Sequence, residues 1–342
     1  SRPYNLHAER GLVQYETECL GLDNEQLVKL IDEELQQPDA SQLKSFLKAN
    51  SSIWEVAHVP VTANIICFLW KESTRDQLEL NVRGSLGSLY QQMSEYVWRR
   101  YVEKNNVRDV NRDEVFNKLG QIAFNALKED QILIDRRLVN RHAQTLNLGK
   151  SLETCGLLLL RLEGAHYQFP HLTFQEYFAG KHLANLLCNG STTDVSRTKR
   201  FLSEMKYAEE WKVVWCFMAE GVRYIDGISG FKTMMSLIDQ EPREIGGFQH
   251  LSLECVLLKA ALSVLLESID LDQLISMEGY EASHVIEGVH ALSVDKDKDI
   301  QGFGFGQIPS LIAALPDWAE TLLERLLDAF RDDDWYVRKY AV

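Results

Sequence analysis

Two glycine-containing segments of the chain could, by residue type, bind a phosphate group. Gly149-Lys150-Ser151 matches the end of a Walker A loop, in which backbone N–H groups and a lysine surround phosphate oxygens. That loop also needs a glycine five residues before Gly149, where this chain has Gln144, and a buried strand before it. Gly302-Phe303-Gly304-Phe305-Gly306 lacks the GxGxxG spacing of dinucleotide-binding proteins. We interpret the first segment as a connecting loop and the second as a flexible joint.

Catalytic and metal-binding patterns are absent from the sequence. The nine histidines form no HExxH motif, and no GxSxG motif is present to expose a serine nucleophile. The six cysteines are scattered without the paired spacing of a zinc site. We therefore predict that this chain by itself is not catalytic and holds no metal.

The most informative segment is Phe169-Pro170-His171-Leu172-Thr173-Phe174-Gln175-Glu176-Tyr177-Phe178-Ala179-Gly180. Its simplest interpretation is a strand end followed by an amphipathic helix whose apolar side chains pack inward. The functional alternative concerns His171, because an imidazole can donate a hydrogen bond to a phosphate at neutral pH.

This whole segment resembles the winged-helix signature of NACHT-domain proteins, in which a phenylalanine, a histidine two residues on, and F-Q-E-[YF]-[FL]-A-A follow in this order. The signature often has leucine where this chain has Pro170, and proline fits a strand end that enters a helix. In that family the histidine donates a hydrogen bond to the β-phosphate of bound ADP. The resemblance implies this role for His171.

Two further segments resemble the same family and occur in the family's order. Ser1-Arg2-Pro3-Tyr4-Asn5 is similar to T-S-R-P-[YF]-N, which implies that Arg2 reads the terminal phosphate. His58-Val59-Pro60, followed by the apolar run Asn64–Trp70, resembles the family's first helical domain, which implies that Pro60 packs on adenine. His58 stands where the family has glycine. The resemblance extends from Ser1 to about Leu187.

What the resemblance implies is a two-state switch controlled by ADP and ATP. ADP would be clamped in a closed state, and exchange for ATP would expose a surface for homo-oligomerisation. The family's Walker A lysine, and the Walker B carboxylates that hold Mg²⁺, would precede Ser1. We therefore expect a longer protein that hydrolyses ATP slowly, and weak nucleotide binding by this part alone.

Hydrophobic spacing and turn residues predict a mainly α-helical chain. Strand residues are expected at 13–20, 156–162 and 167–171, the last two as a hairpin behind helices. Combined with the resemblance, this pattern predicts six parts: the C-terminal end of a P-loop-type α/β nucleotide-binding domain (1–37), a first helical domain (38–108), a winged-helix domain (109–190), a second helical domain (191–294), a linker (295–307) and the start of a helical-repeat array (308–342).

The last residues of the sequence carry a separate resemblance. Asp332–Ala341 is similar to the D-x-D-x-x-V-R-x-x-A start of the second helix in a HEAT-like repeat, in which an aspartate caps the helix. This resemblance implies that protein partners bind through helical repeats. Because the chain begins and ends within such patterns, we expect both ends to continue.

Composition limits the partners and the location. The formal net charge is −14, which disfavours nucleic acids and anionic membrane surfaces. No apolar run approaches the ~20 residues of a membrane-spanning helix. The scattered cysteines indicate a reducing compartment, so we predict a cytoplasmic protein.

Two other classes of function remain open. One is a nucleotide-independent HEAT-like scaffold or adaptor for protein–protein interaction. The predicted hairpin and the three ordered motifs argue against it, because a helical solenoid does not require a hairpin in its middle. The other is an effector enzyme fused to the switch, which would have to be encoded outside this sequence.

Overall fold

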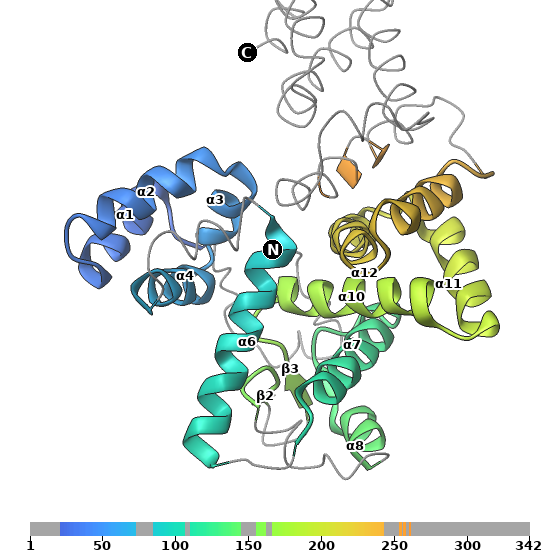
Figure 1. Cartoon of the computed structure of the whole chain (residues 1–342). Helices are drawn as coiled ribbons and strands as arrows, with labels where there is room; N and C mark the ends of the chain where they lie inside the picture. The colour runs from blue at the N-terminus through green and yellow to red at the C-terminus, as the bar shows by residue number, and fades with distance from the viewer. Residues whose placement is uncertain are drawn as a thin grey trace, which may run out of the picture. The chain divides into compact units, whose positions relative to one another are not determined.

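The computed structural model describes residues 21–72, 85–106, 110–144, 155–161 and 166–242, together with five positions between Leu253 and Ala260. Most of these residues are helical (Figure 1). The chain divides into two compact units, residues 1–178 and 179–342. Arg2, the expected strand at 13–20, the linker 295–307 and the repeat segment 308–342 lie outside the described residues.

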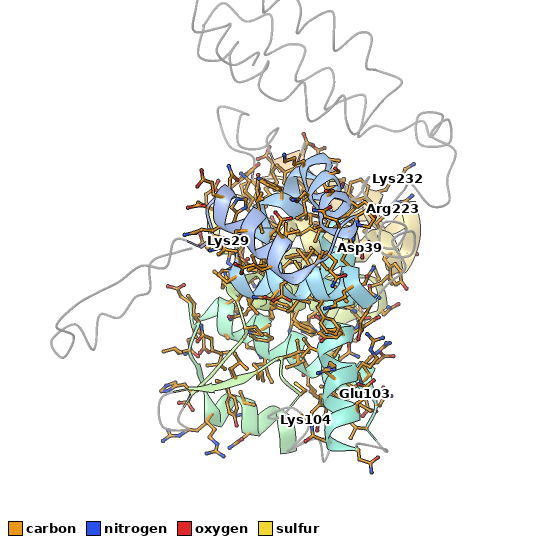
Figure 2. The ribbon with its side chains drawn as sticks, turned by 90° about the vertical axis from the view of Figure 1, so that its left-hand side faces the viewer. Lys29, Asp39, Glu103, Lys104, Arg223 and Lys232 are labelled. Carbon is orange, nitrogen blue, oxygen red and sulfur yellow. The ribbon has the colours of Figure 1, made fainter. Side chains whose placement is uncertain are left out.

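Four helices follow one another at the start of the first unit (blue in Figure 1): α1 (Asn24–Glu34), α2 (Asp39–Ala49), α3 (Ser51–Ala57) and α4 (Pro60–Glu72). Asp23 caps the start of α1. Its carboxylate accepts a hydrogen bond from the Gln26 backbone N–H (2.8 Å), and the Gln26 side chain accepts one from the Asp23 backbone N–H (3.0 Å). The apolar faces of these helices form a shared core, while charged side chains such as Lys29 and Asp39 lie at the surface (Figure 2).

Two longer helices continue the first unit: α6 (Leu86–Asn105) and α7 (Arg112–Lys128). The α6 helix begins where the Ser85 hydroxyl accepts a hydrogen bond from the Ser88 N–H, and it ends at Asn106 in the left-handed conformation (φ 50°). Asn111 caps α7 by accepting from the Asp113 N–H at 2.9 Å.

A small antiparallel sheet follows α7. Its strands are β1 (Ile134–Asp135), β2 (Leu159–Arg161) and β3 (His166–Gln168), in the order β1-β3-β2, and α8 (Arg136–Gln144) follows β1 directly. Tyr167 of β3 is opposite Ile134 on one side and Leu160 on the other. The predicted hairpin is therefore present with shorter strands, because residues 169–171 leave the sheet and lead into the next helix.

The helix α10 (Leu172–Asn189) runs from the first unit into the second, where α11 (Thr192–Met205), a 3₁₀ turn (Glu209–Trp211) and α12 (Lys212–Ile238) follow. Gly180 permits close packing of α10 on α12, since a Cβ atom there would lie 2.6 Å from the Phe217 Cβ and 2.8 Å from the Val214 carbonyl oxygen. The family signature has alanine at this position. The glycine therefore reflects the close approach of α12 in this chain.

Candidate functional site

His171 lies in the short connection between β3 and α10, where it caps the helix. Its carbonyl accepts the first helical hydrogen bond, from the Phe174 N–H at 3.0 Å. Its ring Nδ1 accepts from the Thr173 N–H at 3.2 Å, as a capping side chain does, and also bonds the Thr173 hydroxyl. The imidazole is thus held at Nδ1 by Thr173 of α10.

These bonds determine which ring nitrogen carries the proton. A nitrogen that accepts from an N–H group must be unprotonated, so the neutral ring has its proton on Nε2. His171 Nε2 bonds none of the residues that the structure describes. Burial lowers the pKa of His171 from its ordinary value, which keeps the ring neutral at pH 7. The residue is therefore a neutral donor with one unengaged N–H group.

Pro60 occupies the first position of α4, where the fixed backbone angle of proline suits a helix start. Its ring is exposed, which leaves it available for an apolar contact with a ligand. The preceding His58 has ordinary helical backbone angles (φ −71°, ψ −10°), so this position does not need the glycine that the family carries.

His58 itself is a structural residue. Its Nδ1 lies 2.8 Å from the Trp54 carbonyl oxygen, its Nε2 lies 3.0 Å from the Asn24 side-chain oxygen, and its carbonyl accepts from the Leu22 N–H at 2.7 Å. A Cβ on Gly21 would lie 2.7 Å from that same carbonyl oxygen. His58 therefore fastens residues 21–24 onto the end of α3 and leaves no ring nitrogen for a ligand.

Tyr90 of α6 brings the starts of α4 and α10 together. Its phenol lies beside the hydroxyls of Thr62, two residues after Pro60, and Thr173, two residues after His171. Burial raises the pKa of Tyr90 to about 12, although the two nearby hydroxyls work against the rise. Its ring lies 4.9 Å from that of Phe174 in an edge-to-face arrangement. Sequence reasoning did not identify Tyr90, because nothing local marks a residue that joins two distant helix starts.

Other residues of the signature segment hold α10 in place. Phe174, Tyr177 and Phe178 are buried as predicted, whereas Leu172 is only half-buried. Gln175 is fully buried and donates from Nε2 to the carbonyl oxygen of Gln131, just before β1, at 3.0 Å. This bond fixes the sheet relative to the helix that carries His171.

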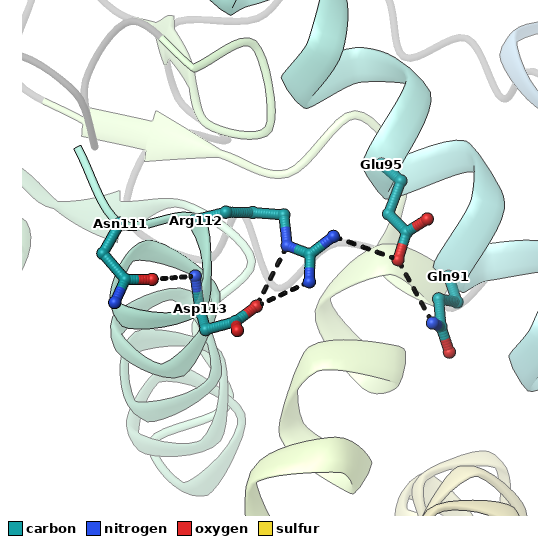
Figure 3. A network of polar contacts seen from close by, with 5 residues as sticks. All are labelled: Gln91, Glu95, Asn111, Arg112 and Asp113. Atoms are coloured by element: carbon teal, nitrogen blue, oxygen red, sulfur yellow. Dashed lines mark hydrogen bonds and ion pairs between the residues drawn. The ribbon is translucent and has the colours of Figure 1, made fainter. Parts of the chain in front are cut away.

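An ion pair links α6 to the start of α7 (Figure 3). Arg112 donates twice to the Asp113 carboxylate, at 2.8 and 2.9 Å, and its other nitrogen lies 3.5 Å from the Glu95 carboxylate. Gln91 donates to the same Glu95 side chain at 3.1 Å. The two acidic partners raise the pKa of Arg112, mainly through the bonds to Asp113. The pair therefore connects the segments predicted as the first helical domain and the winged-helix domain.

Neither Cys67 nor Cys155 is a thiolate nucleophile of low pKa, and the described residues form no metal-binding cluster. Burial raises the pKa of the Cys67 thiol to about 12 and that of Cys155 to about 11. No group of three His, Cys, Asp or Glu side chains in the described part of the chain is arranged to hold a metal ion. Among the helices described, none combines the length and apolar character needed to cross a bilayer.

Comparison with known proteins finds a distant relative of this chain. No family model matches the sequence. The chain is similar to NLR family CARD domain-containing protein 4 of Xenopus tropicalis, with 26% identity over 202 residues. The similar stretch covers 57% of this chain but 19% of the relative, so the chain corresponds to a small part of that protein's length.

Proposed function

We propose that this chain is the regulatory part of a nucleotide-dependent signalling switch of the NACHT class, and that His171 holds ADP in the closed state. The observation that carries the proposal is the orientation of the His171 ring. Nδ1 is engaged by Thr173, and Nε2–H has no partner among the described residues. A donor fixed in this way suits a phosphate oxygen, because its direction is set before the ligand binds.

The second contact of the proposed site is apolar. Pro60 presents an exposed ring at the start of α4, and such a ring can pack on the face of an adenine. Tyr90 lies near the start of α4 and near the start of α10. Arg2 would read the terminal phosphate of ATP, and Mg²⁺ would be held by carboxylates that precede Ser1 in a longer protein. The distant similarity to an NLR family protein supports this class.

In this proposal, ADP favours the closed state because His171 bonds it only there, and ATP releases the winged helix so that subunits associate. The contacts that would break are few. They include the ring contact of Tyr90 with Phe174 and the ion pair between Glu95 and Arg112. Partner proteins would bind through repeats that follow residue 308 and would shift the same equilibrium.

The test uses the complete protein carrying His171→Ala, examined by light scattering with ADP bound. Loss of one charge-assisted hydrogen bond should weaken the closed state by about 1.5–3 kcal/mol, or roughly ten- to a hundredfold in population. The expected result is oligomerisation without an activating partner. A variant that stays monomeric, and whose melting temperature falls equally with and without ADP, would favour the nucleotide-independent scaffold.

A further inference from the structure

The helix α12 is broken at Asp226 and Gly227, which have non-helical backbone angles. Gly227 adopts φ 59° and ψ −146°, a combination that is accessible to glycine and disfavoured for residues with a Cβ atom. The helix therefore consists of two segments, residues 212–225 and 228–238. Backbone N–H groups in the first turn of a new helical segment favour a negative charge nearby.

Arg223 lies just before this break and carries a covered positive charge. The residue is 5% exposed, and among the described residues no acceptor bonds its guanidinium and no carboxylate pairs with it. Burial lowers the pKa of Arg223, but an arginine keeps its proton at neutral pH. Covered charges in folded proteins are normally paired, because an unpaired one is costly. In the described part of the chain, Arg223 therefore lacks an anion.

The Arg223 guanidinium borders an open space above Gly227. A Cβ atom on Gly227 would lie 3.8 Å from Arg223 Nη1. Apart from the two chain neighbours and the nearby helix backbone, no other described atom would lie within 4 Å of that Cβ. By contrast, a Cβ atom on Gly230 would lie 2.8 Å from the Asp226 Cβ. Because Gly227 is also partly exposed, a ligand atom can reach Nη1 through this space, which we call the Gly227 notch.

Nearby acidic residues limit the charge that the Gly227 notch can hold. Asp226 is exposed and Glu220 is 6% exposed, and neither forms an ion pair with Arg223. Burial and the Asp226 carboxylate raise the pKa of Cys188 in α10, so this thiol stays neutral and adds no charge. The two carboxylates would repel a dianion more strongly than a monoanion. A carboxylate carries one charge and two oxygens that match the guanidinium.

An exposed aromatic ring lies next to the Gly227 notch. Tyr224 is 74% exposed, and it precedes Gly227 by three residues, whereas Arg223 precedes it by four. Residues at these two spacings neighbour the same position on a helix. Tyrosine and arginine are enriched in protein–protein interfaces. A free small anion would leave the Tyr224 ring uncovered, so the surface favours a protein ligand.

We propose that the Gly227 notch binds the carboxylate of an Asp or Glu side chain from a partner protein, with Arg223 as the donor and Tyr224 covered by the same partner. The carboxylate would complete the ion pair that Arg223 lacks among the described residues. The site belongs to the second unit of the chain, and it does not depend on nucleotide binding at His171.

The probe for this chemistry is N-acetylglutamate N-methylamide, whose side-chain carboxylate is flanked by two peptide groups as in a protein. Acetate represents a free small carboxylate, and inorganic phosphate represents a more highly charged anion. The measurement is NMR of the arginine Nε–H signals in the labelled 342-residue chain at constant ionic strength, with Arg223→Met identifying the Arg223 signal. We expect a dissociation constant of roughly 1–30 mM for the glutamate derivative, and several-fold weaker binding of acetate and phosphate.

Three variants separate the contributions to binding. Asp226→Asn should strengthen binding about two- to fivefold, because an exposed carboxylate near the notch no longer repels the ligand. Tyr224→Ala should weaken binding of the glutamate derivative and leave that of acetate unchanged. Lys232→Gln is the matched control, since it removes one positive charge from the second segment of the same helix (Figure 2) and should change neither affinity.

Thermal unfolding tests whether Arg223 has a purely structural role. Arg223→Met removes an unpaired covered charge, so without added carboxylate its melting temperature should equal or exceed that of the wild type. The glutamate derivative should raise the melting temperature of the wild type and leave that of Arg223→Met unchanged.

Three results would each overturn the proposal: an Arg223 signal that does not shift with the glutamate derivative, a loss of binding in Lys232→Gln, or a lower melting temperature of Arg223→Met in buffer without carboxylate. Acetate or phosphate binding as tightly as the glutamate derivative would indicate a site for free anions. That result would overturn the assignment of a partner protein.

Discussion

The two histidines at the starts of neighbouring motifs have different surroundings. His58 has both ring nitrogens near oxygen acceptors, the Trp54 carbonyl and the Asn24 side chain, and its ring lies edge-on to the Trp54 indole. His171 is bonded on one side only, and its Nε2 is unengaged among the described residues. Sequence alone makes either histidine a candidate ligand-binding residue. The difference lies at Nε2: in His58 this nitrogen bonds Asn24, which makes His58 a structural residue, whereas in His171 it is available to a ligand.

The largest effect in this comparison is expected from the core beneath His171. Phe174→Ala removes a fully buried ring next to Tyr90 and should lower the free energy of unfolding by about 3–5 kcal/mol. The matched change near His58 is Val59→Ala, at a half-buried position, which should lower it by about 1 kcal/mol. Urea denaturation measures both. An equal loss of unfolding free energy in the two variants would contradict the expectation that the core next to Tyr90 contributes more to stability than the region around His58.

His58→Ala tests the structural assignment directly. The variant loses the side-chain hydrogen bonds to the Trp54 carbonyl and to Asn24, so the free energy of unfolding should fall by about 1–2 kcal/mol. Thermal unfolding of the complete protein should show the same decrease with and without ADP. A decrease that appears only with ADP present would indicate that His58 belongs to the nucleotide site. The two histidines would then not differ in role.

The ion pair between α6 and α7 should contribute less than either histidine. Glu95→Gln is expected to lower the free energy of unfolding by about 0.2–1 kcal/mol, because the Arg112 and Glu95 side chains are 45% and 39% exposed. The difference should shrink in 1 M salt. Glu204→Gln in α11, whose partner Arg200 is 81% exposed, is the control and should have a smaller effect. A loss that persists in high salt would contradict an electrostatic origin.

The pH dependence of stability should carry a contribution from His171. Its pKa in the folded chain is lowered by burial, so the unfolded chain binds the proton more readily. The contribution to stability is complete above the unfolded pKa of about 6.5, and it is lost as the pH falls from there toward the folded pKa. His171→Ser should show a smaller decrease in melting temperature across this range. An unchanged decrease would mean that other groups account for it.

Local features of the fold were predictable, and long-range ones were not. The Asp23 cap, the apolar spacing of α6 and the burial of Phe174 follow from residues within one or two helical turns. The strand β1 contains only Ile134 and Asp135 and exists because β3 pairs with it, so a sequence window of strand length does not show it.

The same limit applied to the candidate site. His171 and Pro60 were found because each lies in a recognisable motif, whereas Tyr90 and the Glu95–Arg112 pair act through partners far away in sequence. His58 looked like a departure from the family pattern. The structure accounts for it, because the position has ordinary backbone angles and the side chain forms bonds that glycine could not. Side-chain partnerships of this kind depend on the packing of helices, which periodicity does not determine.

The rate of ADP release from the complete protein carrying His171→Ser tests the central claim most directly. Serine is a good helix cap, so this change keeps the start of α10 and removes only the donor at Nε2. We predict ADP release roughly ten- to a hundredfold faster than in the wild type, with His58→Ala releasing ADP at the wild-type rate. Release at the wild-type rate from His171→Ser would contradict the account, because the unengaged nitrogen would then bind no phosphate.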